Sequence, residues 1–295
     1  MVKVFKNEKG RERAIESYNR LLASWDVEIT EMDIQTKCGA THCITAGNKE
    51  NPPLLMFHGV GDNSAVMWLL NMKELSQHFY CIAIDTIGGP GKSVPNEKFN
   101  KNEFDQIEWI NEIAKAFMLD RFYVMGVSNG AAITYKYTIH ERDRVIKAVC
   151  VEGGLITKPL KSMIGTLLLL FPEIMIPTKK NMIKAMSKLV SPDSNIYAKH
   201  PEVIDHIIMV EKVHNKSAMF PHKLEKYDKE MALKVKDKLY FILGDYMVES
   251  SKSRQEYVEL LKDVGFKYDV IKNAGHAVNH EQPEIVNEKI IAFLN

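Results

Sequence analysis

The sequence predicts an α/β protein with a mostly parallel, eight-stranded sheet that carries helices on both faces. Six short apolar runs, each ending in glycine or a polar residue, alternate mostly with segments of helical periodicity. Runs of this kind are typical of parallel strands that are buried on both faces. Residues 29–39 and 40–47 instead alternate apolar and polar side chains around a glycine, which predicts an antiparallel hairpin and completes the eight strands.

The composition is that of an ordinary folded protein and excludes several other classes. The chain has 295 residues, of which 45% are hydrophobic and 26% are charged. These proportions exclude a collagenous chain, a coiled coil and wholesale disorder. Thirty-nine Lys and Arg residues nearly balance 38 Asp and Glu residues, and the formal charge is +1. We therefore expect no nucleic acid partner, because no global field attracts one.

The cysteines and the termini indicate a cytoplasmic protein. Four cysteines in a chain of this length form no disulfide framework, and no Cys-x-x-Cys pair indicates a metal site. The N-terminal segment lacks the apolar core of a secretory signal. The most apolar stretch, residues 163–177, contains Pro172 and Glu173. It is shorter than the roughly 20 residues of a membrane-spanning helix, so we expect no stable membrane association.

The strands and helices can be placed in order along the chain. A short amphipathic helix comes first, and the hairpin follows it. The six apolar strands are expected in residues 52–59, 79–86, 121–128, 146–154, 238–245 and 268–276. Three helices are marked by their periodicity, by a C-terminal glycine or by an early proline, and they cover residues 105–119, 253–265 and 282–294.

Residues 155–232 interrupt the alternation of strands and helices. This segment contains no convincing strand, is rich in lysine, and holds seven of the fifteen methionines. We expect it to form a helical cap over a core made of residues 1–154 and 233–295. Its most apolar run is too hydrophobic for a solvated helix, so Leu168, Leu169 and Met175 are candidates for lining a substrate pocket. Methionines that only fill gaps in the core are the alternative.

Ser128 is the candidate nucleophile. It lies in Gly126-Val-Ser128-Asn-Gly130, between a predicted strand and a predicted helix. In that context the two glycines permit a sharp turn that exposes the serine hydroxyl. A tight turn without a chemical role is the alternative.

His276 is the candidate base, because a serine hydroxyl needs a group that accepts its proton. It follows the last predicted strand in Asn-Ala-Gly-His, where a loop can return toward Ser128. A surface histidine in a turn is the alternative for His276, and His280 is the fallback base. The backbone amides of Val60 and Asn129 are the candidate donors to an oxyanion, and His58 is expected to orient the loop that carries Val60.

The order of these features resembles the α/β-hydrolase superfamily. His58-Gly59, Asp85, Gly-x-Ser-x-Gly, a cap, Gly244-Asp245 and the Asn-Ala-Gly-His run succeed one another as in that superfamily. The resemblance covers essentially the whole chain after the first 25 residues, and residues 85–95 are similar to a subgroup of bacterial carboxylesterases. It implies a Ser-His-acid triad, no cofactor and an ester or related acyl substrate.

The acid of the implied triad is not where the superfamily usually has it. That position, three residues after Gly244, is Met247. Glu152 at the end of an earlier strand is our prediction, since haloalkane dehalogenases of similar fold in part use that strand. Asp245 is the alternative, and Glu249 is a third possibility.

A second motif competes for a functional interpretation. Residues 86–93, TIGGPGKS, imitate a phosphate-binding loop, but the first glycine is replaced by Thr86. The α/β-hydrolases carry a similar Asp-x-x-Gly turn at this place, so we favour the turn.

Taken together, these features predict a serine hydrolase that cleaves carboxylic esters of small to medium hydrophobic substrates through an acyl-enzyme. Lactonase, thioesterase or C–C hydrolase activity would use the same residues. A ligand-binding protein without catalytic activity is the alternative from another class, and the methionine at position 247 is its main support.

Overall fold

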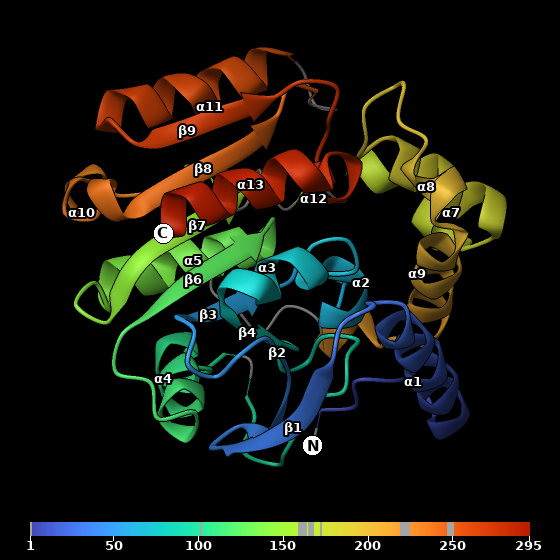
Figure 1. Ribbon diagram of the computed structural model, residues 1–295. Coiled ribbons are helices and arrows are strands. Elements are labelled where there is room, and N and C mark those ends of the chain that lie inside the picture. The colour runs from blue at the N-terminus through green and yellow to red at the C-terminus, as the bar shows by residue number, and fades with distance from the viewer. Residues whose placement is uncertain are drawn as a thin grey trace.

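The computed structural model is a single sheet flanked by helices (Figure 1). It describes residues 2–100, 102–158, 164, 168–171, 173–218, 225–246 and 251–295. The strands follow the spatial order β1-β2-β4-β3-β6-β7-β8-β9, and β5 pairs with β2. Their bounds are β1 Ile29–Thr36, β2 Gly39–Ala46, β3 Pro53–Phe57, β4 Tyr80–Ile84, β5 Val94–Pro95, β6 Phe122–Val127, β7 Val145–Val151, β8 Leu239–Gly244 and β9 Lys267–Ile271.

The sheet is mostly parallel, as predicted. Strands β1, β2 and β4 pair in antiparallel fashion, and β4, β3, β6, β7, β8 and β9 are parallel to their neighbours. The expected count of eight strands was wrong by one within the described residues. The additional strand, β5, has two residues and pairs with Gly39 and Ala40 of β2, so it is too short to show a periodic pattern.

The strand order reverses between β3 and β6, which lie side by side. From β3 the chain moves outward to β4, beyond which the earlier strand β2 lies, and from β6 it moves in the opposite direction through β7, β8 and β9. Such a reversal leaves a crevice at the carboxyl ends of the two central strands, where ligands bind in open α/β sheets. The segments that begin at His58 and Ser128 both leave the sheet at this crevice.

Helices cover both faces of the sheet and one end of it (Figure 1). The predicted helices are present as α4, α11 and α13, and Gly265 ends α11 with a φ of +82°. The helices are α1 Glu8–Ala23, α2 Ser64–Met67, α3 Met72–His78, α4 Gln106–Ala116, α5 Asn129–His140, α7 Lys179–Ser187, α8 Ile196–Lys199, α9 Pro201–Val213, α10 Lys229–Leu233, α11 Ser251–Val264, α12 Val278–Glu281 and α13 Pro283–Leu294.

Alternate residues of the central strands form two separate hydrophobic cores. In β3, Leu54 and Met56 pack with the helices of one face, while Leu55 and Phe57 pack with those of the other. The same alternation holds in β4 and β6. Both faces are therefore apolar, which explains why these strands read as continuous hydrophobic runs in the sequence.

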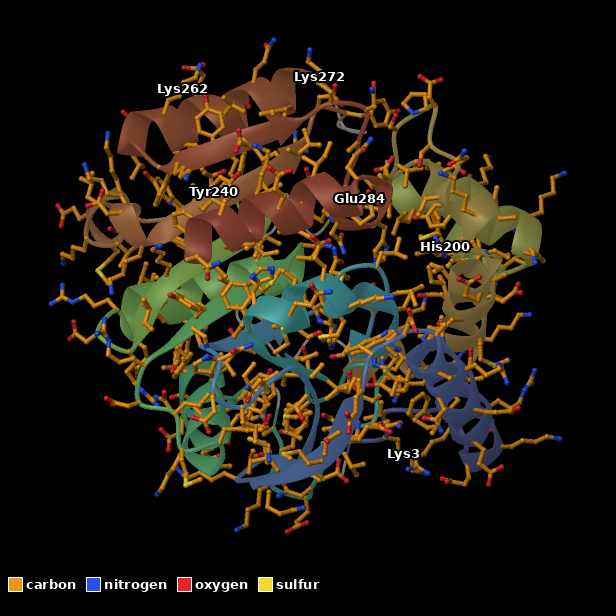
Figure 2. The ribbon with its side chains drawn as sticks, viewed as in Figure 1. Lys3, His200, Tyr240, Lys262, Lys272 and Glu284 are labelled. Carbon is orange, nitrogen blue, oxygen red and sulfur yellow. The ribbon has the colours of Figure 1, made fainter. Side chains whose placement is uncertain are left out.

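Several lysine side chains lie at the surface. Lys3, Lys262 and Lys272 are exposed, and Figure 2 shows them on the outside of the molecule. The four cysteines are free, as expected. None of the helices in the described part of the chain combines the length and the apolarity needed to cross a bilayer.

The described residues between 155 and 232 are helical or irregular. They include α7, α8, α9 and α10, and the one pairing recorded here is an isolated bridge between Phe5 and His214. Helix α9 packs against α1, so the N-terminal helix contacts this segment as well as the sheet. Figure 1 shows α1, α7, α8 and α9 together at one end of the sheet.

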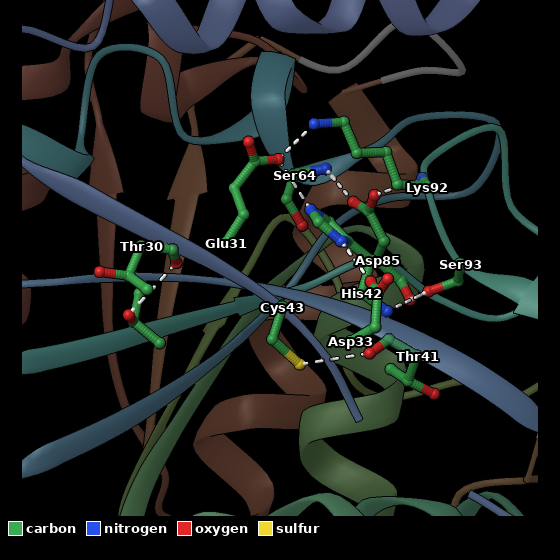
Figure 3. A network of polar contacts seen from close by, with 11 residues as sticks. Thr30, Glu31, Asp33, Thr41, His42, Cys43, Ser64, Asp85, Lys92 and Ser93 are labelled. Atoms are coloured by element: carbon green, nitrogen blue, oxygen red, sulfur yellow. Dashed lines mark hydrogen bonds and ion pairs between the residues drawn. The ribbon is translucent and has the colours of Figure 1, made fainter. Parts of the chain in front are cut away.

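The loop after β4 is tied down by a buried carboxylate (Figure 3). The Oδ1 atom of Asp85 accepts a hydrogen bond from the amide of Ser64 at 2.9 Å, and Oδ2 accepts one from the amide of Lys92 at 2.7 Å. The hydroxyl of Ser93 donates to the carbonyl of Asp85 at 2.6 Å. Asp85 is fully buried, so each of these bonds satisfies a group that water does not reach.

This loop does not have the geometry of a phosphate-binding loop. It leads into strand β5, whereas a phosphate-binding loop leads into a helix whose N-terminus receives the phosphate. The ammonium of Lys92 is bound to the carboxylate of Glu31 and lies 4.8 Å from the centre of the Tyr18 ring. The lysine that would contact a phosphate is therefore already paired.

Replacing Asp85 by Asn should destabilise the fold, because an amide nitrogen would face one of the two backbone N–H groups. We expect a loss of about 1.5 to 3 kcal/mol in the free energy of unfolding, measured by urea denaturation. Asp143→Asn is the control, because Asp143 is exposed. Equal unfolding midpoints for the two variants would contradict this role of Asp85.

Candidate active site

Ser128 occupies a strained turn between β6 and α5. Its φ is +57° and its ψ is −114°, a conformation that costs of order 1 to 3 kcal/mol for a residue other than glycine. The amide of Ser128 donates to the carbonyl of Val151 at 2.9 Å, and its carbonyl accepts from the amides of Ala131 and Ala132. These bonds hold the turn in place between β7 and the first turn of α5.

The two glycines of the motif are required by close backbone contacts. A Cβ atom at position 126 would lie 2.2 Å from the carbonyl of Gly130. A Cβ atom at position 130 would lie 2.0 Å from the carbonyl oxygen of Phe57 in β3. No side chain fits at either position, because backbone atoms fill the space.

His276 meets the hydroxyl of Ser128. Its Nε2 atom lies 2.9 Å from the Ser128 Oγ, so the neutral imidazole can accept the hydroxyl proton when Nδ1 carries its own hydrogen. The His276 amide donates to the carbonyl of Leu189 at 2.6 Å. The preceding amide, that of Gly275, donates to the carboxylate of Glu281 at 2.6 Å. Two successive amides thus hold the loop after β9 at the histidine.

Glu152 faces the other nitrogen of His276. Its Oε2 atom lies 3.4 Å from Nδ1, and its φ of +50° is a second strained backbone conformation next to that of Ser128. The residue is 7% exposed, and its carboxylate accepts hydrogen bonds from the amide of Gly244 and from Nη2 of Arg254. Burial raises the pKa of Glu152, but the hydrogen bond from His276 and the charge of Arg254 outweigh it and hold the pKa below its usual range.

The other candidate acids do not meet His276 in the described structure. Asp245 is exposed, and its Oδ1 atom accepts a hydrogen bond from the amide of Ala274 at 3.3 Å. Met247 and Glu249 lie outside the described residues. Glu152 is therefore the candidate that the described residues bring to the imidazole.

The loop after β3 lies against the serine turn. A Cβ atom on Gly59 would be 3.5 Å from the Cβ of Ser128, and Val60 is the next residue of the same loop. Asn129 is the first residue of α5, so its amide has no acceptor within the helix. The two amides predicted to bind an oxyanion thus begin on segments that flank Ser128.

Two further histidines, His58 and His280, form hydrogen bonds with backbone groups. The Nδ1 of His58 donates to the carbonyl of Gly59 at 2.8 Å, and its Nε2 accepts from the amide of Thr86 at 2.9 Å. Burial lowers the pKa of His58, so the ring is neutral and ties the loop after β3 to the loop after β4. His280 is buried, with Nε2 donating to the carbonyl of Met67 at 2.9 Å.

The predicted pocket residues are exposed in this structure. Leu168 is 66% and Met175 is 67% exposed, and Leu169 is partly buried. The carbonyl of Leu169 accepts a hydrogen bond from Nζ of Lys188 at 2.8 Å. Contact of these side chains with a substrate stays a prediction, and Leu167 lies outside the described residues.

Arg254 belongs to the site and was missed from the sequence. It lies on α11, 102 positions after Glu152 in the chain, and is only 8% exposed. The one signal was its spacing of three and seven residues before Tyr257 and Leu261, which places a charged residue on the apolar face of the helix.

The geometry of this arrangement suits proton transfer coupled to nucleophilic attack. A serine hydroxyl meets a neutral imidazole, and a buried carboxylate faces the opposite ring nitrogen. An imidazole placed in this way can take the proton of an attacking hydroxyl, and the carboxylate can stabilise the cation that results. Among the described residues, no group of three or more His, Cys, Asp or Glu side chains is placed to hold a metal ion.

The sequence is similar to those of known proteins. Residues 31–161 match the model of the Ndr family. The chain is 26% identical to the Carboxylesterase YbfK of Bacillus subtilis (strain 168), with 96% of this chain and 93% of the relative covered. It is 25% identical to the "Uncharacterized carboxylesterase nap" of the same organism, with 96% and 92% covered.

Solved structures show the same fold over the whole chain. The naproxen esterase (carboxylesterase NP) from Bacillus subtilis superimposes with a TM-score of 0.82 at 23% identity and covers 98% of this chain and 100% of its own. The carboxylesterase CesB (YbfK) gives a TM-score of 0.80 at 22% identity, with 97% and 99% covered. The predicted fold class and the resemblance to bacterial carboxylesterases are both confirmed.

Replacing Gly130 by Ala should destabilise the protein strongly, because the new Cβ would overlap the backbone of β3. We expect a loss of about 3 kcal/mol or more in the free energy of unfolding. Gly265→Ala is the matched control, since no atom lies within 4 Å of a Cβ there and only its φ of +82° opposes the change. The control should lose about 1 to 2 kcal/mol. A smaller loss at position 130 than at position 265 would rule out the steric explanation.

Proposed function

We propose that this α/β-hydrolase is a serine hydrolase that cleaves carboxylic esters through an acyl-enzyme. The observation that carries the proposal is the 2.9 Å contact between Ser128 Oγ and His276 Nε2, with the buried carboxylate of Glu152 behind the imidazole. The names of two full-length relatives, both carboxylesterases, support an ester substrate.

The first half-reaction acylates the serine. Ser128 Oγ attacks the ester carbonyl carbon while its proton passes to His276 Nε2. The carbonyl oxygen becomes an oxyanion, which accepts hydrogen bonds from the amides of Val60 and Asn129. When the tetrahedral intermediate collapses, the C–O bond to the alcohol breaks, and the alcohol leaves with the proton from Nε2.

The second half-reaction releases the acid. A water molecule gives a proton to His276 Nε2 and attacks the acyl carbon. A second tetrahedral intermediate then collapses, and Ser128 recovers its proton as the carboxylic acid departs. In both halves Glu152 accepts the Nδ1–H of His276 and stabilises the imidazolium that forms.

Residues 155–232 form the cap of this enzyme in our proposal, over a core of residues 1–154 and 233–295. The cap presents Leu168, Leu169 and Met175 to the acyl or alcohol part of the substrate. An apolar lining of this kind favours small to medium hydrophobic esters.

Labelling with a fluorophosphonate probe tests the nucleophile. Wild-type protein should be labelled, and Ser128→Ala should not, because the probe reacts with an activated serine. Turnover of nitrophenyl esters should fall by about four orders of magnitude or more in Ser128→Ala and His276→Ala. His280→Gln should stay labelled and active. If the correctly folded wild type is neither labelled by the probe nor able to hydrolyse the esters, a ligand-binding protein without catalytic activity is favoured.

Three amide variants assayed on one ester identify the acid. Glu152→Gln keeps the size of the side chain but removes the charge behind the imidazole. It should lower kcat by about 10³- to 10⁴-fold. Asp245→Asn and Glu249→Gln should remain within a few-fold of wild type. A larger loss in either of those variants than in Glu152→Gln would assign the acid to that residue instead.

The chain-length preference tests the cap. Leu168→Ala or Leu169→Ala should weaken the preference for longer acyl chains by about 1 to 3 kcal/mol per lost contact, because each variant removes apolar surface. The measurement is kcat/KM across a series of nitrophenyl esters. Ile183→Ala is a control on an exposed apolar residue of α7. If both leucine variants retain the wild-type preference while folded, these residues do not line the pocket.

A further inference from the structure

The carboxylate of Glu152 is held more closely by Arg254 than by His276. Nη2 of Arg254 lies 2.9 Å from Oε1 and 2.8 Å from Oε2, whereas Nδ1 of His276 lies 3.4 Å from Oε2. The amide of Gly244 also donates to Oε1. The carboxylate therefore has one partner from β8, one from α11 and one from the loop after β9.

We propose that Arg254 is a positioning residue, which holds the Glu152 carboxylate behind His276 and shares its Oε2 atom with the imidazole. This inference rests on the proposed function of the same site. It adds a fourth residue, on an element that supplies none of the proposed triad. Arg254 does not touch the serine or a substrate in this arrangement and acts only through Glu152.

The resting state shows why the Glu152 carboxylate needs a cation beside it. In that state His276 is neutral and offers Glu152 a single N–H group. A carboxylate that is 7% exposed and has only such a partner tends to bind a proton, because burial disfavours its charged form. The guanidinium keeps the carboxylate ionised until His276 becomes charged.

The other titratable groups that face Glu152 from the described elements do not replace Arg254. Tyr257, also on α11, donates its hydroxyl to the carbonyl of Gly153 at 2.7 Å, and burial raises the pKa of this phenol. Glu281 on α12 accepts hydrogen bonds from the amides of Ser191 and Gly275, and burial raises its pKa. Neither group supplies a positive charge. Among the described groups, Arg254 is therefore the permanent cation beside this carboxylate.

The pH dependence of kcat/KM on a nitrophenyl ester separates this role from a merely structural one. In Arg254→Met the Glu152–His276 pair should bind its proton more readily, because the neighbouring positive charge is gone. The acidic limb of the profile should move to higher pH by about one unit, and the plateau should fall about tenfold. Arg254→Lys keeps the charge but not the two-oxygen contact, so its limb should stay near that of wild type while its plateau falls.

Lys262→Met is the matched control, since it removes one positive charge from the same helix. Lys262 is exposed, points outward in Figure 2 and pairs with Glu259. Its profile should equal that of wild type. A lower plateau with an unmoved acidic limb in folded Arg254→Met would overturn the proposal.

A double variant tests whether Arg254 acts through Glu152. In the Glu152→Gln background, Arg254→Met should change kcat by less than about twofold, because the group on which it acts is gone. This double variant also removes both buried charges together, which avoids leaving one of them unpaired if the single variant folds poorly. Independent losses that multiply in the double variant would show that Arg254 acts elsewhere.

A readout without turnover keeps this inference separate from the proposed function. Carboxyl ¹³C resonances of labelled glutamates can be followed through a pH titration, with Glu152→Gln identifying the resonance. The Glu152 resonance should titrate at higher pH in Arg254→Met than in wild type. If the protein hydrolyses no ester but this shift is present, the proposed function fails and the pairing stands. If esters are hydrolysed but the resonance does not move, the pairing fails and the proposed function stands.

Discussion

The backbone contact between the turn at Ser128 and the end of β3 is the constraint on which the site depends. Gly130 lies against the carbonyl of Phe57 so closely that a Cβ would come within 2.0 Å of its oxygen. This contact sets where α5 begins and presses the Ser128 turn against the loop that carries Gly59 and Val60. The candidate nucleophile thus lies beside the loop that carries one predicted oxyanion donor because of main-chain packing. No flexible side chain is involved in that packing, so the geometry has little freedom to vary.

Backbone strain occurs at the ends of two neighbouring strands, and one of these ends also carries a buried charge. Ser128 after β6 and Glu152 after β7 both have positive φ values, and the two strands are neighbours in the sheet. Strain of this kind persists only where surrounding contacts maintain it. Around Glu152 those contacts are the amide of Gly244 and the guanidinium of Arg254, which satisfy a carboxylate that water scarcely reaches. The buried carboxylate of Asp85 is likewise satisfied by hydrogen bonds, from two backbone amides.

The features that were predicted correctly depend on residues close together in the sequence. The five buried strands β3, β4, β6, β7 and β8, the hairpin and helices α4, α11 and α13 follow from periodicity, glycine and proline over short windows. The sixth predicted strand is also present, but it is the edge strand β9 and only its last residue is buried. Strand β5 was missed because two residues carry no period. Residues 86–93 show that a motif can match in sequence without having the structure that its function requires. Lys92 and Ser93 have the right identities, but they are bound to Glu31 and Asp85 and lead into a strand.

The sequence by itself determined the fold class, the strained position of Ser128 and the placement of His276 after the last strand, because each follows from the order of strands and turns. Only the tertiary structure decided which carboxylate faces His276. Asp245 and Glu152 both follow strands whose ends meet at one edge of the sheet, and the choice depends on the direction in which each backbone turns there. The contact between Arg254 and Glu152 is also visible only in the tertiary structure. It joins residues 102 positions apart, and no local pattern encodes the distance between two elements that meet only when the sheet is complete.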